Sequence, residues 1–331
     1  MPPDEAAPAP PRAAASEAPF HADVADAPEE AHALWREAPD GVRLRVALLA
    51  RGPARGASGT VLLFPGRTEY AEKYGPVARW LGGLGLAVLT VDWRGQGLSA
   101  RLLPDAGVGH VVAFPDYQRD VAALLGAADA LGLPEPRHLL AHSMGGAIGL
   151  RALMEGLPVA SAAFSAPMWG IVMATGLRPV ARALGWASRP LGLSERYAPG
   201  TGRTMHLEGA PFAGNLLTGD RETFEWLRRQ VTAHPDLALG GPSLRWLGEA
   251  LAEERALARL PSPAVPCLCG LGSAEGVVSA AVIRERMARW PGGRLLVVEG
   301  GRHELMMERA PLREAFLGAV AEHLAAHAPA G

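Results

Sequence analysis

The sequence contains one stretch that decides the fold, Leu139-Leu140-Ala141-His142-Ser143-Met144-Gly145-Gly146. A mostly apolar run at 138–141 precedes the serine, and a helix-like run at 144–155 follows it. Small residues stand two places before and two places after Ser143, as a sharp strand-to-helix turn requires, because larger side chains would collide across the turn. Such a turn lifts the serine hydroxyl above the end of a sheet and directs the next backbone N–H, that of Met144, towards a reacting oxygen. The stretch therefore predicts a serine nucleophile at a strand-to-helix turn.

Short strand-like runs alternate with helix-like runs around this stretch, a pattern typical of an α/β protein with a parallel sheet. Strands are predicted at 60–64, 86–91, 159–165, 265–270 and 294–299, and helices at 70–84, 116–131, 279–289 and 308–327. Residues 33–37 and 42–49 flank a Pro39-Asp40-Gly41 turn and are predicted to form an antiparallel hairpin at one edge. The expected fold class is α/β, with a mostly parallel central sheet flanked by helices.

The alternation of strand-like and helix-like runs stops between residues 168 and 262, where the sequence shows no clear pattern of a buried strand. Helix-like runs at 174–188, 220–233 and 242–260 occupy this part, separated by proline and glycine. Residues 1–30 are rich in proline, alanine and acidic residues, and we expect them to form a disordered tail. The predicted organisation is a tail (1–30), the first part of a core (31–167), a helical insert (168–262) and the second part of the core (263–331).

The composition excludes several classes of function. The chain has 331 residues and a formal net charge of −2, so nothing electrostatic favours nucleic acid as a partner. No run reaches the ~18 apolar residues of a membrane span, and residues 1–30 lack the pattern of a secretion signal, so a cytoplasmic location is expected.

Cys267 and Cys269 are interpreted as small apolar strand residues, because two thiols alone make no zinc site. Lys73 is the only lysine, which we interpret as compositional bias.

A serine hydroxyl is a weak nucleophile and needs a base, which in turn needs an acid to hold its tautomer. After a nucleophile turn of this type the partners follow in the order acid, then histidine, each just after a strand of the sheet. Glu275 follows the strand predicted at 265–270, and His303 follows the strand predicted at 294–299. We therefore predict Ser143 as nucleophile, His303 as general base and acid, and Glu275 as the carboxylate that orients the histidine.

Other titratable residues compete less well for these roles. Glu275 could instead be a solvated loop acid, since aspartate is the more usual residue there. Glu304 adjoins the predicted base and is poorly placed to reach back to its ring. Asp92 ends an earlier strand and is interpreted as structural, paired with Arg94. His142 lies inside the nucleophile turn and is expected to pack in the core or against a loop.

The loop after the strand at 60–64 is predicted to complete the site. Acyl transfer passes through an oxyanion, which two backbone N–H groups stabilise. Met144 supplies the first of these donors. Gly66 lets the backbone of the loop approach the reacting oxygen, so the second predicted donor is the N–H of Arg67.

Together these motifs resemble those of the α/β-hydrolase superfamily, and within it the monoacylglycerol lipase and bacterial lysophospholipase group. The resemblance covers about residues 33–325 and rests on Gly66-Arg67-Thr68-Glu69-Tyr70, Asp92-Trp93-Arg94-Gly95-Gln96-Gly97-Leu98-Ser99, Gly109-His110-Val111, Asp116-Tyr117, Ala141-His142-Ser143-Met144-Gly145-Gly146 and Gly272-Ser273-Ala274-Glu275. It implies an α/β-hydrolase fold under an inserted helical cap, and cleavage of the carboxylic esters of mono-acyl lipids without a cofactor or metal. A small-molecule ester, thioester or lactone hydrolase stays open, as does, with less support, a non-catalytic binding protein on the same scaffold.

The sequence departs from this group at Pro65-Gly66-Arg67, where many relatives carry His-Gly and a small residue. The side chain of Arg67 could reach a phosphate or a glycerol hydroxyl of the substrate, or it could be a solvated loop arginine. Met168 and Trp169 follow directly on the strand predicted at 159–165 and could line an acyl-chain pocket between cap and core.

The run at 174–188 predicts an amphipathic helix. Its apolar positions are Leu177, Val180, Ala181 and Leu184, with Arg178 and Arg182 elsewhere on its surface. Such a helix could lie on an anionic bilayer, which would place the protein at the inner membrane, or it could be an ordinary solvated helix. The head group, the acyl-chain length and the oligomeric state are left open by the sequence.

Overall fold

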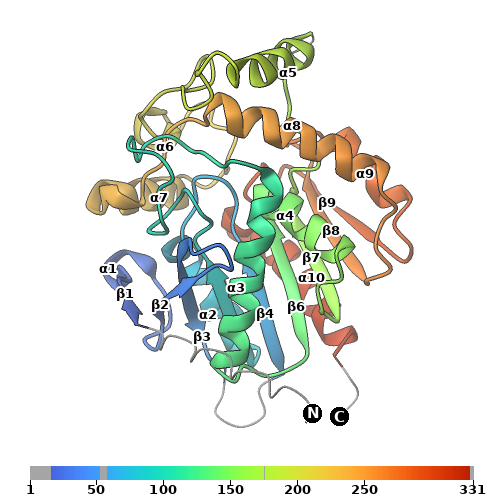
Figure 1. Ribbon diagram of the computed structural model, residues 1–331. Coiled ribbons are helices and arrows are strands. Elements are labelled where there is room, and N and C mark those ends of the chain that lie inside the picture. The colour runs from blue at the N-terminus through green and yellow to red at the C-terminus, as the bar shows by residue number, and fades with distance from the viewer. Residues whose placement is uncertain (1–15, 53–57, 175, 329–331) are drawn as a thin grey trace, which may run out of the picture.

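The computed structural model describes residues 16–52, 58–174 and 176–328, and within them it forms one central sheet (Figure 1). The strand order is β1-β2-β3-β5-β4-β6-β7-β8-β9. The strands are β1 (Glu17–Ala18), β2 (His32–Glu37), β3 (Arg43–Ala50), β4 (Gly59–Phe64), β5 (Leu86–Val91), β6 (Arg137–His142), β7 (Ser161–Ser165), β8 (Cys267–Gly272) and β9 (Arg294–Val298). Strands β1, β2, β3 and β5 pair antiparallel in succession, and the pairs from β5 to β9 are parallel. The predicted fold class and the predicted hairpin at one edge are confirmed.

Helices cover both faces of this sheet. They are α1 (Ala22–Ala25), α2 (Gly75–Gly83), α3 (Tyr117–Ala130), α4 (Ser143–Met154), α5 (Leu177–Ser188), α6 (His206–Gly209), α7 (Arg221–Ala233), α8 (Leu244–Arg259), α9 (Ala280–Ala288) and α10 (Ala310–Ala326). Successive residues of β4 alternate between two hydrophobic clusters, because side chains in a strand point to opposite faces. Leu62 and Phe64 join the cluster that contains residues of α3, α4 and α9, while Val61 and Leu63 join the cluster that contains residues of α2 and α10. This burial on both faces explains why β4 is apolar throughout.

The segment between β7 and β8, which we call the insert, contributes helices α5 to α8 and adds no strand to the sheet within the described residues. In Figure 1 these helices lie across the end of the sheet at which α4 begins. Helix α8 contacts both α5 and α4, which fixes the insert to the core. Gly185 and Gly248 allow the close approach of α5 and α8, since a Cβ at Gly185 would lie 2.8 Å from the Cα of Gly248. The insert therefore covers the end of the sheet at which β6 ends and α4 begins.

The prediction of a disordered tail through residue 30 is wrong for residues 16–30. Strand β1 pairs with β2, and Ala25 of α1 is buried against Gly75, where a Cβ would lie only 1.9 Å from the Ala25 carbonyl oxygen. Arg45 also donates to the Pro19 carbonyl at 3.0 Å. These tertiary contacts hold a segment whose composition alone suggests disorder. Residues 1–15 lie outside the described residues.

No helix within the described ranges is both long and apolar enough to cross a bilayer.

Candidate active site

Ser143 lies at the turn between β6 and α4, as the sequence predicts. Its φ angle is +50°, a left-handed conformation that non-glycine residues rarely adopt. The turn leaves no room for a side chain at Gly145, because a Cβ there would lie 2.2 Å from the Phe64 carbonyl oxygen. Glycine at this position therefore lets the loop after β4 rest directly on the first turn of α4.

The three predicted triad residues come together at the carboxyl ends of β6, β8 and β9. His303 Nε2 lies 2.9 Å from Ser143 Oγ, and His303 Nδ1 lies 2.9 Å from Glu275 Oε2. The second carboxylate oxygen of Glu275 accepts the backbone N–H groups of Val277 and Val278 at 2.6 and 3.0 Å. Burial opposes ionisation of Glu275, but the hydrogen bond from His303 and these N–H groups together lower the pKa of this carboxyl. The arrangement is a hydroxyl, an imidazole and an anionic carboxylate in series.

The loop that carries Gly66 and Arg67 is held beside Ser143 by two side chains from the loop after β5. Trp93 Nε1 donates to the Pro65 carbonyl at 2.8 Å, and Gln96 Nε2 donates to the Gly66 carbonyl at 2.8 Å. On the other side of the serine, the Met144 N–H lies in the first turn of α4, where backbone donors have no intrahelical acceptor. Both predicted oxyanion donors thus belong to segments that pack against each other next to the serine.

A group of charged side chains, which we call the buried ion cluster, lies behind the triad and was missed by the sequence interpretation. Lys73 Nζ donates to Glu69 Oε1 at 2.6 Å and to Glu304 Oε1 at 2.7 Å. The other oxygen of Glu69 accepts the Gly66 N–H and the Tyr74 hydroxyl. All of these side chains are buried. The cluster therefore connects the loop after β4 with the residue that follows His303.

His142 also belongs to this cluster and is buried, which agrees with the prediction that it packs in the interior. Its Nε2 lies 3.3 Å from Glu304 Oε2, its Nδ1 lies 3.0 Å from the Ser165 carbonyl oxygen, and its ring centroid lies 4.8 Å from that of His303. Burial opposes charge on His142, yet Glu304 and Glu69 raise its pKa.

Opposite charges favour the ionised forms of Glu304 and Lys73 in the interior. Against the effect of burial, the ammonium of Lys73 and the neighbouring His142 lower the pKa of Glu304 well below its ordinary range. The same carboxylates, Glu304 and Glu69, raise the pKa of Lys73 despite its burial. Lys73 thereby supplies the positive charge that the paired carboxylates require. The presence of a single lysine in the sequence is the signal that could have indicated this role, and compositional bias does not explain its buried position.

The predicted pairing of Asp92 with Arg94 is wrong. Asp92 Oδ2 accepts from Arg45 Nε at 2.8 Å, while Arg94 pairs with Asp40 and Asp120 at 2.8 and 2.7 Å. The two side chains leave the loop after β5 in different directions, so each meets partners from distant segments. Asp92 is nonetheless structural, as predicted, because it also accepts the Ala71 and Leu98 backbone N–H groups.

The two residues predicted to line an acyl pocket differ in their surroundings. Trp169 is enclosed by Phe164 and Trp290, with ring centroids at 5.1 and 6.0 Å, and its indole N–H donates to the Gly146 carbonyl at 3.1 Å. This ring is part of the core, so we do not retain Trp169 as a substrate contact. Met168 is buried in the same hydrophobic cluster, but it lies next to the serine, since its backbone N–H donates to the Ser143 carbonyl at 2.8 Å.

The fold and this site define an α/β-hydrolase. A model of the Hydrolase_4 family, described as serine aminopeptidase S33, matches residues 55–310, and the chain therefore belongs to this family.

Three comparisons illustrate its neighbours. The chain is similar to lysophospholipase L2 of Escherichia coli strain K12, with 37% identity over 82% of each chain. It is also 30% identical to a probable lysophospholipase L2 of Haemophilus influenzae, over 78% of this chain and 82% of that one. Among solved structures, a soluble variant of monoglyceride lipase from Saccharomyces cerevisiae superimposes with a TM-score of 0.69 at 18% identity, covering 89% of this chain and 95% of that one. At that identity the last match supports the fold alone.

Proposed function

We propose that the protein is a serine hydrolase that cleaves the carboxylic ester of mono-acyl lipids, either lysophospholipids or monoacylglycerols, through an acyl-enzyme. The observation that carries this proposal is the position of His303, whose two ring nitrogens lie 2.9 Å from Ser143 Oγ and 2.9 Å from Glu275 Oε2. The lysophospholipase L2 relatives support the class of substrate. No cofactor takes part in this reaction.

In the first half of the reaction, Ser143 Oγ attacks the ester carbonyl carbon and His303 Nε2 takes the hydroxyl proton. Glu275 accepts the Nδ1–H, which keeps Nε2 free as the base and stabilises the imidazolium. The bond from the carbonyl carbon to the glycerol oxygen then breaks, and His303 gives its proton to that oxygen. The products of this step are the free alcohol and an acyl group on Ser143.

In the second half, water attacks the acyl carbonyl while His303 takes its proton, and the bond to Ser143 Oγ breaks as the proton returns to the serine. Each half passes through an oxyanion. We assign its stabilisation to the backbone N–H groups of Arg67 and Met144, and loss of one such donor lowers the rate by about 10²–10³-fold. Met168, beside Ser143, is the side chain that we assign to the acyl group.

Helix α5 is the surface through which we propose that the enzyme meets a lipid layer. The sequence predicts that Leu177, Val180, Ala181 and Leu184 share its apolar face. In the structure Leu177, Val180 and Leu184 are exposed by 50%, 52% and 39%, whereas Ala181 is buried. Trp186 is exposed by 76%, whereas the buried residues of α5 are the small ones, Ala181, Gly185 and Ser188. An outward apolar face with a tryptophan is typical of helices that lie in a membrane interface. The cytoplasmic location stays an expectation, supported by the free thiols of Cys267 and Cys269.

The proposed function is tested with Ser143→Ala. This variant should lose hydrolysis of a short p-nitrophenyl ester and labelling by a fluorophosphonate probe, because both need the same oxygen. A wild-type series of esters with increasing acyl length then separates the lipid ester from a small-molecule ester. Preference for acetyl over long chains would reject the lipid substrate, and persistent labelling of the alanine variant would reject the assigned nucleophile.

A further inference from the structure

The guanidinium of Arg67 is held between the core and the insert without a carboxylate. Solvent reaches part of this residue, but its Nε is buried and has no hydrogen-bond partner in the described residues. Its Nη2 donates to the Gly240 carbonyl at 2.7 Å, and its Cζ lies 5.1 Å from the centroid of the Trp246 ring. Burial without a nearby acid lowers the pKa of Arg67 to about 10. Buried charges in proteins are usually paired with an opposite charge, and the guanidinium of Arg67 has no such anion within the described residues.

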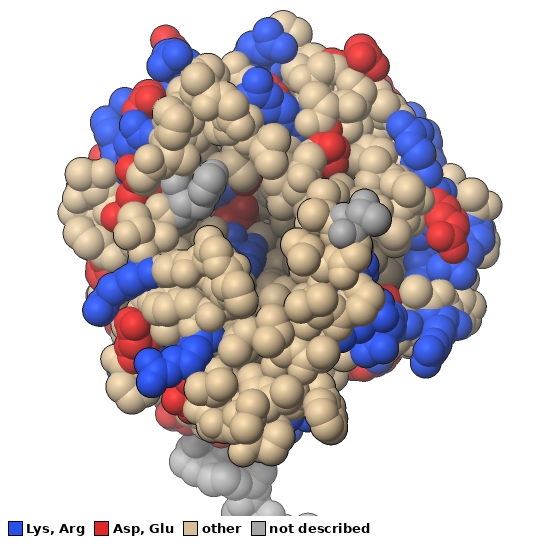
Figure 2. Space-filling model, turned by 90° about the horizontal axis from the view of Figure 1, so that it is seen from above, with Lys and Arg blue, Asp and Glu red and all other residues tan. Residues whose placement is uncertain are grey.

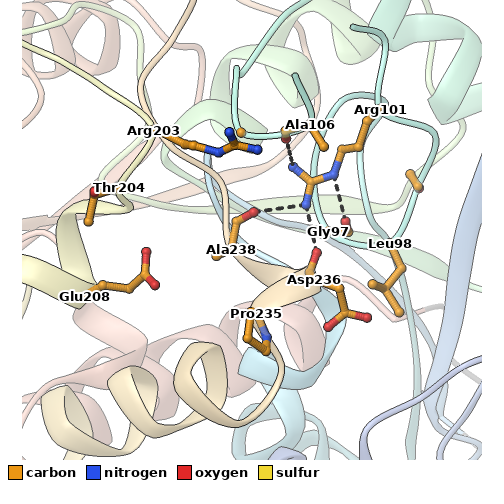
Figure 3. Close-up of a pocket in the computed structure, with 12 residues that line it drawn as sticks. Gly97, Leu98, Arg101, Ala106, Arg203, Thr204, Glu208, Pro235, Asp236 and Ala238 are labelled. Atoms are coloured by element: carbon orange, nitrogen blue, oxygen red, sulfur yellow. Dashed lines mark hydrogen bonds between the residues drawn. The ribbon is translucent and has the colours of Figure 1, made fainter. Parts of the chain in front are cut away.

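Other arginines of the described chain that are buried or partly buried show what a satisfied guanidinium looks like. Arg45 and Arg94 each pair with two carboxylates. Arg101 has no carboxylate, but it donates to the carbonyls of four residues at the seam between core and insert (Figure 3). Arg286 donates to two carbonyls and a hydroxyl. A guanidinium has five N–H donors, and Arg67 differs from these residues in leaving most of them unused.

The position of Arg67 links this free charge to the reacting ester. Its backbone belongs to the loop that rests on the first turn of α4, beside Ser143. Gly109 makes room for the side chain, because a Cβ there would lie 2.6 Å from Arg67 Nη2. The face that carries the insert is hollowed near its middle, and charged side chains are visible inside the hollow (Figure 2). The free guanidinium and the backbone N–H that we assign to the oxyanion therefore belong to the same residue. The charge lies no farther from the ester carbonyl than the length of one arginine side chain.

We propose that Arg67 binds the phosphate of the substrate head group, so that the enzyme selects mono-acyl lipids with a phosphodiester over neutral monoacylglycerols. This inference rests on the proposed ester hydrolysis and names its head group. A lysophospholipid carries the phosphate and the acyl ester on the same glycerol, within the reach of a single residue. The planar fork of arginine matches two phosphate oxygens, and charge-assisted bonds of this kind are the stronger ones.

The first test compares a lysophospholipid and a monoacylglycerol with the same short acyl chain, both as monomers in solution. The quantity measured is the ratio of their kcat/KM values, because any general loss of activity cancels in it. Arg67→Met should lower the ratio by about 10- to 100-fold. Arg101→Met is the matched control, since it removes another partly buried arginine at the same seam and should leave the ratio within about twofold. An unchanged ratio in Arg67→Met would overturn the inference, as would an equal fall in the control.

The second test needs no variant and so does not depend on folding. Glycerophosphoethanolamine, the product released from a lysophospholipid with an ethanolamine head group, is added to wild-type enzyme acting on a short p-nitrophenyl ester. We expect competitive inhibition at least about tenfold stronger than that by glycerol, and weaker inhibition at high salt. Inhibition no stronger than that by glycerol would contradict the phosphate site.

The two proposals fail in different ways. If wild-type enzyme hydrolyses the p-nitrophenyl ester but neither lipid, the proposed function is wrong and this inference falls with it. If it hydrolyses both lipids and the ratio is the same in wild type and Arg67→Met, only the head-group assignment is wrong.

Discussion

Lys73 Nζ lies 2.7 Å from Glu304 Oε1, although 231 residues separate them in the chain. Lys73 belongs to the short 3-10 helix (Ala71–Tyr74) that follows the loop after β4, and Glu304 directly follows His303. This ion pair therefore joins the two segments that must hold their positions around Ser143. Through Glu69 it also reaches the N–H of Gly66.

Substitution of the lysine tests the importance of this pair. Lys73→Met should lower the free energy of unfolding by about 3–5 kcal/mol, because it leaves Glu69 and Glu304 buried without their counter-ion. Urea denaturation of the full chain measures this change. Arg79→Met is the control, since its pair with Asp26 is more than half exposed and should contribute little. Equal effects of the two substitutions would show that the burial of Lys73 is energetically unimportant.

The stability of the cluster should depend on pH at both extremes. The folded-state pKa of Glu304 lies well below its ordinary value of 4.5, so its contribution is present above pH 4.5 and is lost as pH falls through the folded value. The pKa of Lys73 is raised above 10.5, so its contribution is present below pH 10.5 and is lost as pH rises through the folded value.

Unfolding free energies of wild type and Glu304→Gln, measured from neutral to acid pH, check the acid side of this window. The difference between the two proteins should shrink as pH falls, because wild type loses the charge that the variant lacks. Glu314→Gln changes an exposed acid and should show no such convergence. A constant difference down to the acid limit would argue against an ionised Glu304.

The nucleophile turn should not accept a methyl group. Gly145→Ala places a Cβ 2.2 Å from the Phe64 carbonyl oxygen, so the loop after β4 must move away from Ser143. We expect a destabilisation of about 1–3 kcal/mol and a fall in kcat of at least about 100-fold, the effect of losing one oxyanion donor. Gly318→Ala in α10 is the control, because a Cβ there meets nothing within 4 Å and the helix should gain up to about 1 kcal/mol. Full activity in Gly145→Ala would place the oxyanion donors elsewhere.

The exposed face of α5 predicts binding to lipid vesicles. Val180→Ser combined with Trp186→Ser should weaken sedimentation with anionic vesicles by at least about tenfold, since both side chains would leave the apolar layer. Leu84→Ser is the control, because Leu84 is 44% exposed but ends α2, just before the amino end of β5. If the Leu84 variant binds as weakly as the α5 variant, the contact with lipid is not specific to α5.

The sequence by itself determined the strand-to-helix turn at Ser143, the sheet and the chain order of the triad. These features follow from local rules: strand and helix periodicity, and the small residues that a tight turn demands. The two helix faces at α5 show the limit of such rules. The spacing grouped Leu177, Val180 and Leu184 correctly but assigned Ala181 to the same face. In the structure Ala181 is buried together with Gly185, which contacts Gly248, while the other three side chains lie outward.

Only the tertiary structure decided the electrostatics. The residues around Lys73 do not predict its ion pair with Glu304. The sequence of the loop after β4 likewise does not predict that Arg67 contacts Gly240 and Trp246 and has no carboxylate partner among the described residues. The pairing of Asp92 was mistaken for the same reason, since its partner Arg45 lies on another strand. Whether a buried charge finds a counter-ion depends on which segments, far apart in the chain, come together in the fold. Periodicity and turn chemistry describe only neighbouring residues, so they do not predict these contacts.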